Sequence, residues 1–495
     1  MNRNVESHFS MLPSAEISRS RFDRSFDHKT TFNVGELIPF FVDLTVMPGD
    51  TFDITTSKVV RLQTLLTPVM DNIYLDTYWF FVPFRLLHTH WREIMGENRA
   101  SAWLPEVQYT VPQIKASYAL GGTYYTTANK KNYVDSGSIF DYMGIPISDT
   151  TDLGENTYHD FSFSAYAWRA YCMIFNEWFR DENLTDPVNW SDGDADLTVT
   201  QIRAAGLDKP LKVAKYHDYF TSSIPSAQKG PAVTVPGNFD PSLMKIGWPV
   251  VPPDTTQPDY ESVGTGSYRP LKWRATSGQV LENQSTGLIE VKDTGGNNRI
   301  APGLVASAGI YPSNLFARPS SNVATGLNIL VNDLRYAFQL QKLYERDARG
   351  GTRYIELIKS HFSVESPDAR MQRPEYLGGN RIPISIHQIT NQSQGENDFL
   401  GDLGAMSLTT DKHNDFVKSF TEHGVLLGLM CARYDHSYPQ GLNRMWSKKS
   451  RFDFYWPVFA NLGEQATLRK EIYLENPSAS EPEQQNKYYY LPSAL

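Results

Sequence analysis

The sequence predicts a mainly β fold with long loops and a few helices. Strand-like segments, rich in β-branched and aromatic residues, occur near both ends of the 495-residue chain. Aromatic residues make up 13% of the chain, which is ample material for a core. Residues 231–312 hold ten of the 30 prolines and ten of the 33 glycines, a content that favours turns over long regular elements.

Two strands are expected first. Residues 36–46 (ELIPFFVDLTV) are strand-like and end at a turn over Met47–Asp50. Pro39 lacks an amide donor, so it indicates an edge or a bulge. Residues 72–84 (NIYLDTYWFFVPF) are almost continuously apolar, which predicts a strand buried on both faces.

Helical patterns follow from Arg85 to about Gly96 and from Phe161 to Phe179. Residues 104–158 show no sustained period and are expected to be surface loop with short strands. Residues 186–212 are expected to be mainly loop, whereas residues 215–222 (KYHDYFTS) are interpreted as a short strand. His88 and His90 are two residues apart, but no further metal ligand lies at helical or finger spacing, so packing or solvent-facing histidines are favoured. His217-Asp218 resembles a catalytic pair without a nucleophile, and a structural hydrogen bond is favoured there.

A helix pair is predicted over residues 327–367. One face of its first helix would carry Leu327, Val331, Leu334 and Phe338, and Gly350-Gly351 would end it. Thr352 would cap a second helix with an apolar face of Ile355, Ile358 and Phe362, closed by Pro367, followed by loop to Gly378-Gly379. The pair could join neighbouring subunits or form an ordinary hairpin in a core.

Three strands are expected after the helix pair. Residues 381–390 alternate apolar and polar, which predicts a half-buried strand, and residues 425–432 predict a buried one. Residues 452–459 (FDFYWPVF) are interpreted as a third strand, interrupted by proline.

Composition and motifs exclude several classes of function. The net charge of −9 argues against a protein that coats nucleic acid over its whole surface. Two cysteines cannot form a disulfide scaffold, and the N-terminal residues lack the apolar stretch of a secretory signal. No run approaches the roughly 18 apolar residues of a membrane span. Catalytic and phosphate-loop motifs are missing, so we expect neither an enzyme nor a bound cofactor or metal.

One stretch suggests contact with nucleic acid. In residues 444–456 the cations alternate with aromatic side chains, and the candidate DNA contacts are Arg444, Trp446, Lys448, Lys449 and Arg451. Cations that follow phosphates beside rings that stack on bases suit single-stranded DNA. The alternative is an exposed basic turn that leads into a core strand.

A second cluster, over residues 345–381, balances six arginines against six acidic residues. Balanced charge suits ion-paired protein contacts better than phosphate binding. The candidate intersubunit contacts are Arg346, Arg349, Arg370 and Arg373. The alternative is a solvated face.

Four long segments of the chain are distinctive. They are SRSRFDRSFDHKTTFNVGELIPFFVDLTVMPGDTF at 18–52, LDTYWFFVPFRLLHTHW at 75–91, KYHDYFTSSIPSAQKGPAV at 215–233, and ERDARGGTRYIE with SPDARMQRPEYLGG in 345–379. These segments closely resemble the major capsid protein of gokushoviruses, small single-stranded DNA phages of the Microviridae. The resemblance implies an eight-stranded antiparallel jelly roll and a T=1 shell of about sixty copies around circular single-stranded DNA.

The resemblance also implies partners and a location. The partners are further copies of the chain, the packaged DNA, a small basic DNA-binding virion protein, a pilot protein and a host cell-surface receptor, with no membrane insertion. The location is the virion, after assembly in the cytoplasm of the host bacterium, where two free thiols are in keeping with a reducing compartment.

The expected organisation is an N-terminal arm over residues 1–30, a jelly-roll core over 31–230 and 313–495, and a surface insertion over 231–312. Similar insertions in gokushovirus capsid proteins form protrusions at the three-fold axes. The insertion residues expected at a three-fold or host-facing contact are Trp248, Tyr260, Tyr268 and Trp273, with a tip from Asp293 to Asn298.

Two other classes of protein would leave different signals in the sequence. A glycan-binding β protein or glycosidase would place a carboxylate pair in an aromatic cleft, and usually carries a secretion signal. An outer-membrane barrel needs the same signal and a stronger alternation on its lipid-facing side.

Overall fold

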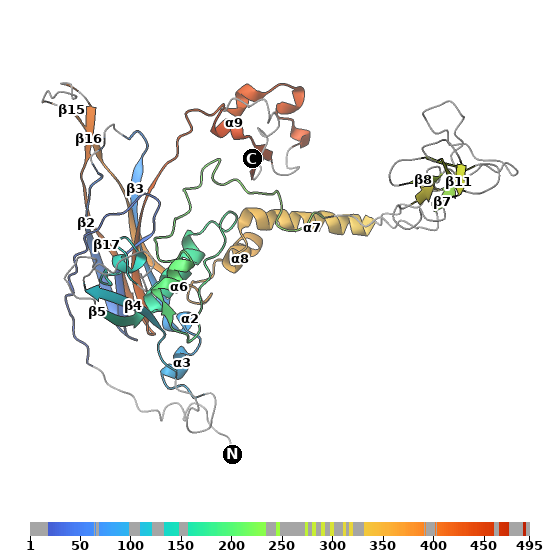
Figure 1. The fold of residues 1–495 in the computed structure, drawn as a ribbon. Coiled ribbons are helices and arrows are strands. Elements are labelled where there is room, and N and C mark those ends of the chain that lie inside the picture. The colour runs from blue at the N-terminus through green and yellow to red at the C-terminus, as the bar shows by residue number, and fades with distance from the viewer. Residues whose placement is uncertain are drawn as a thin grey trace, which may run out of the picture. The chain divides into compact units, whose positions relative to one another are not determined.

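The computed structural model describes residues 18–233, the strands within 244–319, residues 331–474 and residues 489–491. Gaps in these ranges lie at 64, 66–68, 99–108, 121–132, 148–156, 391, 393–400, 402 and 460–464. The chain divides into two compact units, one of Met1–Ala227 with Arg346–Leu495 and one of Gln228–Glu345. Figure 1 shows the elements of each.

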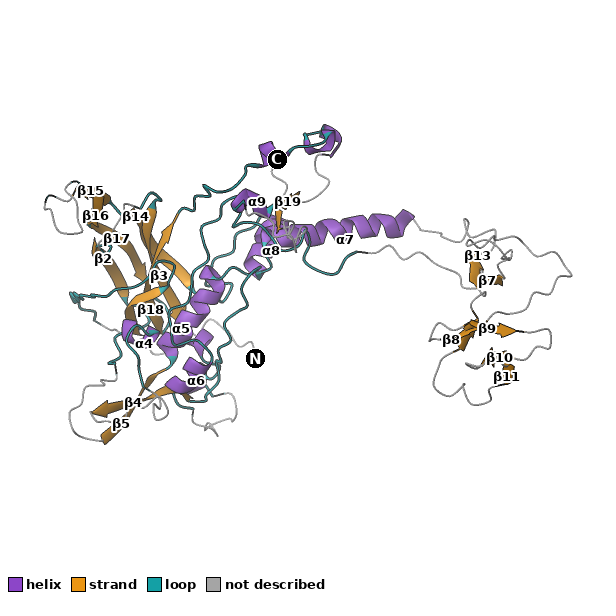
Figure 2. Cartoon of the chain, turned by 45° about the horizontal axis from the view of Figure 1, so that its top comes forward, coloured by secondary structure: helices purple, strands orange, loops and turns teal. Residues whose placement is uncertain are grey.

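A four-stranded antiparallel sheet organises the first unit (Figure 2). Its strands are β1 (Ile38–Val46), β18 (Gly424–Tyr434), β3 (Ile73–Pro83) and β14 (Glu375–Pro383), in that order. The first strand of the chain therefore pairs with a strand almost 400 residues later. This pairing of chain ends within one sheet is the connectivity of a jelly roll.

Both faces of this sheet are buried, as the apolar run in β3 predicts. Phe80 and Val82 of β3 face a core shared with the helices, whereas Trp79 and Phe81 face a second core. A strand projects alternate side chains to opposite faces, so a strand covered on both sides needs apolar residues at every position.

The second core lies between this sheet and the antiparallel pair of β2 (Thr51–Val60) and β17 (Thr409–Ser419). The Trp79 ring packs against Phe416 there, and the Phe420 ring packs against Phe52 and Phe81. Two antiparallel layers with an aromatic core between them confirm the predicted mainly β, jelly-roll class.

The region between Pro367 and Thr390 differs from its prediction. Gly378 and Gly379 lie inside β14 rather than in a loop. A Cβ at Gly379 would lie 2.0 Å from the Thr77 carbonyl oxygen, so glycine is required by close backbone approach. The strand predicted over 381–390 is two strands, because β14 ends at Pro383 and β15 (Ile386–Thr390) pairs separately with β16 (Leu403–Ser407).

Short helices cover the outer face of the four-stranded sheet. They include α2 (Phe84–Leu87) and α3 (Trp91–Ile94), so the single helix predicted after Arg85 is interrupted at His88. The others are α4 (Ile139–Tyr142), α5 (Tyr166–Ile174) with the π-helical turn η1 (Phe175–Phe179), and α6 (Val199–Ala204).

The helix predicted from Phe161 begins only at Tyr166. The preceding residues form β5 (Thr157–Ser164), which pairs with β4 (Gln113–Leu120). The short strand β6 (Leu197–Thr198) lies parallel to β4, and β19 (Gln465–Thr467), α9 (Arg469–Ile472) and β20 (Tyr489–Leu491) follow near the C-terminus.

The predicted helix pair is present as α7 (Val331–Gly350) and α8 (Tyr354–Phe362). Gly351 has φ +90°, the left-handed conformation expected after a helix end. Arg353, rather than Thr352, is the N-cap of α8, and its backbone N–H and its guanidinium both donate to Glu356. Val331, Leu334 and Phe338 are exposed in this single chain.

Residues 215–222 do not form the predicted strand. The backbone N–H groups of Phe220 and Thr221 donate to Asp218 Oδ1 at 2.8 and 2.7 Å, which closes a turn. The hydroxyl of Tyr438 donates to Asp218 Oδ2 at 2.8 Å. The Asp218 side chain therefore makes structural hydrogen bonds, as the sequence analysis favoured over a catalytic pair with His217.

The second unit contains short antiparallel strands. A five-stranded sheet runs in the order β11 (Asn298–Ile300), β10 (Ile289–Lys292), β9 (Val280–Asn283), β8 (Trp273–Ala275) and β12 (Ile310–Pro312). The strands β7 (Met244–Gly247) and β13 (Phe316–Pro319) form a separate pair. Across the parts of the chain that the structure describes, none of the helices is both long and apolar enough to span a bilayer.

Candidate nucleic-acid interface

Residues 443–459, here called the basic-aromatic segment, fold into three single turns. These are η5 (Arg444–Ser447), η6 (Arg451–Asp453) and η7 (Pro457–Phe459). Lys449 and Ser450 donate their backbone N–H groups to Asp453 Oδ2 at 2.9 and 2.6 Å. The predicted strand over 452–459 is wrong, because the backbone N–H groups of Phe452 and Asp453 also bond locally, to the hydroxyl and the carbonyl of Ser450, and residues 451–453 and 457–459 form turns.

The aromatic side chains of this segment face solvent. Trp446 is 71% exposed and Tyr455 78% exposed, and further exposed apolar residues are Phe452, Phe454, Trp456, Val458 and Phe459. The alternative of a basic turn that leads into a core strand does not describe them. An exposed apolar patch of this kind marks a surface for contact with another molecule.

Cations lie against these rings. Lys448 Nζ is 4.8 Å from the ring centroid of Phe454, and the Arg451 guanidinium carbon is 4.7 Å from that of Phe452. Such contacts orient the cations while leaving them hydrated. Asp453 is the one acidic residue among residues 443–459, against four Lys and Arg. Backbone hydrogen bonds from Ser450 and Lys449 hold the pKa of Asp453 below its usual range.

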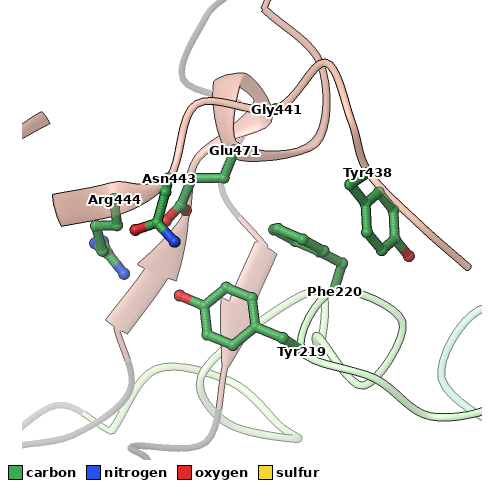
Figure 3. Close-up of a pocket in the computed structure, with 7 residues that line it drawn as sticks. All are labelled: Tyr219, Phe220, Tyr438, Gly441, Asn443, Arg444 and Glu471. Carbon is green, nitrogen blue, oxygen red and sulfur yellow. The ribbon is translucent and has the colours of Figure 1, made fainter. Parts of the chain in front are cut away.

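A pocket of about 440 Å³ lies beside the segment (Figure 3). Tyr219, Phe220 and Tyr438 give it aromatic walls, and Asn443 and Arg444 lie at the edge that continues into the segment. Unpaired bases stack on aromatic side chains, often beside a guanidinium, and this pocket offers both.

The structure separates the four candidate intersubunit arginines into two kinds. Arg373 is buried and held within its own chain, because its guanidinium lies 4.1 Å from the Trp178 ring centroid and donates to the Glu177 carbonyl at 3.3 Å. Arg346, Arg349 and Arg370 lie on the exposed surface.

The insertion candidates are described only in part. Trp248, Tyr260, Tyr268 and Asp293 lie outside the described residues. Trp273 opens β8, and Asn298 opens β11, where it pairs with Lys292 of β10. The predicted tip thus connects two paired strands.

Sequence reasoning missed two polar clusters. Asp76 is buried under two arginines from distant strands, and Asp194 joins His88 and His90. In each cluster the partners are more than 100 residues apart, so no local spacing could reveal them.

Comparison with known proteins agrees with this architecture. The chain matches the family described as Capsid protein (F protein) over residues 10–492. It is similar to capsid protein VP1 of Chlamydia phage 1, at 36% identity over 97% of this chain and 81% of the relative. It is also similar to capsid protein VP1 of Bdellovibrio phage phiMH2K, at 37% identity over 100% and 85%. The VP1 of Spiroplasma virus 4 is 33% identical over 95% and 79%.

The matches span nearly the whole chain, and they include the segments on which the gokushovirus resemblance rests, so that resemblance is confirmed. The relatives are structural proteins by name, which removes the glycosidase alternative. The chain belongs to the capsid protein (F protein) family and is a structural component of a phage virion.

Proposed function

We propose that the chain closes into a T=1 shell of about sixty copies around circular single-stranded DNA, and that the basic-aromatic segment contacts this DNA on the inner surface. The observation that carries the DNA contact is the exposure of cations and ring faces together in residues 443–459. Cations attract the phosphates, and exposed rings stack on bases without selecting a sequence.

This contact is local. The chain carries a net charge of −9, so its copies cannot neutralise a packaged genome. The small basic virion protein implied by the family resemblance would supply most of the counter-charge, and the pilot protein would complete the particle. Assembly in the host cytoplasm belongs to the same proposal.

The subunit contacts of the shell would cover apolar side chains that the single chain exposes. Tyr354 and Phe362 of α8 are both exposed. Arg346, before this helix in the sequence, and Arg370, after it, are exposed as well. Apolar residues bordered by Arg are typical of protein interfaces.

Salt-dependent binding of single-stranded DNA tests the segment. The double variant Lys448→Gln/Lys449→Gln should flatten the slope of log K against log salt by about 1.4, since each phosphate contact contributes about 0.7. Trp446→Ala should weaken binding by about 1–3 kcal/mol if the ring stacks on a base. The matched control is Lys209→Gln/Lys212→Gln, two exposed lysines elsewhere in the same unit.

The control should bind as the wild type does. Unchanged binding of the Lys448→Gln/Lys449→Gln variant at low salt would show that these lysines belong to an ordinary solvated turn. The DNA contact would then have to lie on another surface.

A second function, host attachment, is proposed for the insertion. Its tip, residues 293–297, joins β10 to β11, so it can be shortened without removing a strand pair. Deleting residues 294–297 should leave shell assembly intact and reduce adsorption to host cells. Loss of assembly would make the tip structural, and unchanged adsorption would place host recognition elsewhere.

A further inference from the structure

Two loops bring three metal-ligating side chains together in the first unit. His88 Nε2 lies 2.7 Å from Asp194 Oδ1, and His90 Nδ1 lies 3.0 Å from both carboxylate oxygens of Asp194. The three candidate ligand atoms all lie within 4.8 Å of one another. Two imidazole nitrogens and one carboxylate oxygen are a common ligand set for zinc.

The spacing suits an ion with little rearrangement. Zinc bonds of about 2.0–2.1 Å in a tetrahedron separate neighbouring ligand atoms by about 3.3 Å. The observed separations of 2.7 and 3.0 Å are those of hydrogen bonds, in which protons occupy the space between the atoms. Opening the two His–Asp separations by a few tenths of an ångström would admit the ion in place of these protons, and the two imidazole nitrogens lie within 4.8 Å of each other.

The buried ring of His88 is held from its other side. Its Nδ1 lies 3.0 Å from the Tyr166 hydroxyl. A hydroxyl can donate or accept, so Tyr166 supports either tautomer of His88, including the one that leaves Nε2 free to ligate.

The other two side chains are also fixed by neighbours. The His90 ring stacks on Tyr109 at a centroid distance of 3.9 Å and an angle of 8°. The buried Arg169 guanidinium donates to the Leu87 carbonyl at 2.9 Å and to the Gly193 carbonyl at 2.7 Å. These carbonyls immediately precede His88 and Asp194, so a single side chain sets the distance between the two loops.

From this arrangement we infer that His88, His90 and Asp194 bind one divalent transition-metal ion of the zinc class. His90 and Asp194 reach solvent, so water can take the remaining coordination position. The ion would fasten residues 88–90 to residue 194, and its role would be to stabilise this part of the subunit. Sequence spacing could not reveal this set of ligands, because Asp194 is 104 residues from His90.

The test uses the full untagged chain after removal of metal with a chelator. Titration with Zn²⁺ by calorimetry, and with Co²⁺ by visible absorption, should show one ion per chain and a rise in melting temperature with ion concentration. His90→Ala and Asp194→Asn should each weaken binding at least about tenfold, and Tyr166→Phe should also weaken it. His387→Ala, an exposed histidine on β15, is the matched control and should bind normally.

Circular dichroism of each variant separates weaker metal binding from unfolding. A folded His90→Ala or Asp194→Asn variant is sufficient by itself for the comparison of metal binding with the wild type. Absence of a one-to-one complex in the wild type, or equal binding by wild type and a folded His90→Ala or Asp194→Asn variant, would overturn the site. The three side chains would then be a hydrogen-bonded cluster only.

Discussion

Arg433 Nη2 on β18 donates to Asp76 Oδ2 on β3 at 2.6 Å, although the Asp76 side chain is only 2% exposed. Arg381 of β14 donates to the other oxygen of Asp76 at 2.8 Å, and the Tyr216 hydroxyl donates at 2.7 Å. A single buried carboxylate therefore links three adjacent strands of the four-stranded sheet to the loop before Asp218.

Removing this carboxylate should destabilise the fold. Asp76→Ala removes the carboxylate partner of Arg433, whose side chain is 15% exposed, and of Arg381, whose side chain is 52% exposed and reaches water. Breaking a buried ion pair from one side costs about 3–5 kcal/mol, and the exposure of Arg381 places the expected loss at the low end of this range. The midpoint of urea unfolding of the unassembled chain measures this loss. Asp23→Ala, which removes an exposed carboxylate, should unfold at the wild-type midpoint. Equal midpoints for Asp76→Ala and wild type would show that the cluster contributes nothing to stability.

The same cluster predicts a dependence on pH. Burial alone would raise the pKa of Asp76, but hydrogen bonds from Arg381, Tyr216 and Arg433 outweigh it and hold the pKa below its ordinary value of 3.8. A pKa that is lower in the folded state stabilises the fold above the unfolded pKa, and this stability is lost as the pH falls through the folded pKa.

The difference in unfolding free energy between wild type and Asp76→Asn should therefore be largest near neutral pH and shrink below about pH 4. Urea unfolding at several pH values measures this difference. A difference that stays constant down to acid unfolding would contradict the shifted pKa.

Glycine at position 379 should be essential to the sheet. A Cβ there would collide with the Thr77 backbone, which cannot move without breaking the β3–β14 pairing, so Gly379→Ala should cost more than about 2 kcal/mol. Gly404→Ala is the matched control in strand β16, because its Cβ would make only an ordinary 3.7 Å contact. Thermal melting compares the two variants. Similar melting temperatures would show that the backbone at Gly379 can move aside.

The sequence was sufficient for the long buried strands but not for their neighbours. Continuous apolar runs in β3 and β18 are a local signal, so both were predicted with nearly correct ends. The aromatic run at 452–459 looks equally strand-like, yet it forms turns and pairs with no strand among the residues that the structure describes. Pairing is a property of distant residues, and a local pattern does not contain it.

The candidate site shows the same contrast between local signals and long-range contacts. The cations and rings of the basic-aromatic segment are adjacent in sequence, so the segment could be proposed directly. The partners of Asp76 and Asp194 come together only through the fold. Arg373 illustrates the converse, since composition grouped it with surface arginines while the structure buries it against Trp178.

Charge reversal at the surface arginines should impair assembly without unfolding the chain. Arg346→Glu combined with Arg370→Glu should reduce the yield of particles in sedimentation, because acidic partners across a subunit contact would be repelled. Arg61→Glu, at another exposed position, provides the control. Particle yields equal to the control would place both arginines in solvent and remove them from the interface.

Electron microscopy of the purified full-length protein under assembly conditions tests the central claim most directly. The proposed shell predicts uniform closed particles with icosahedral symmetry and about sixty copies of the chain. A stable compact monomer at high concentration, or open filaments without closed particles, would contradict it.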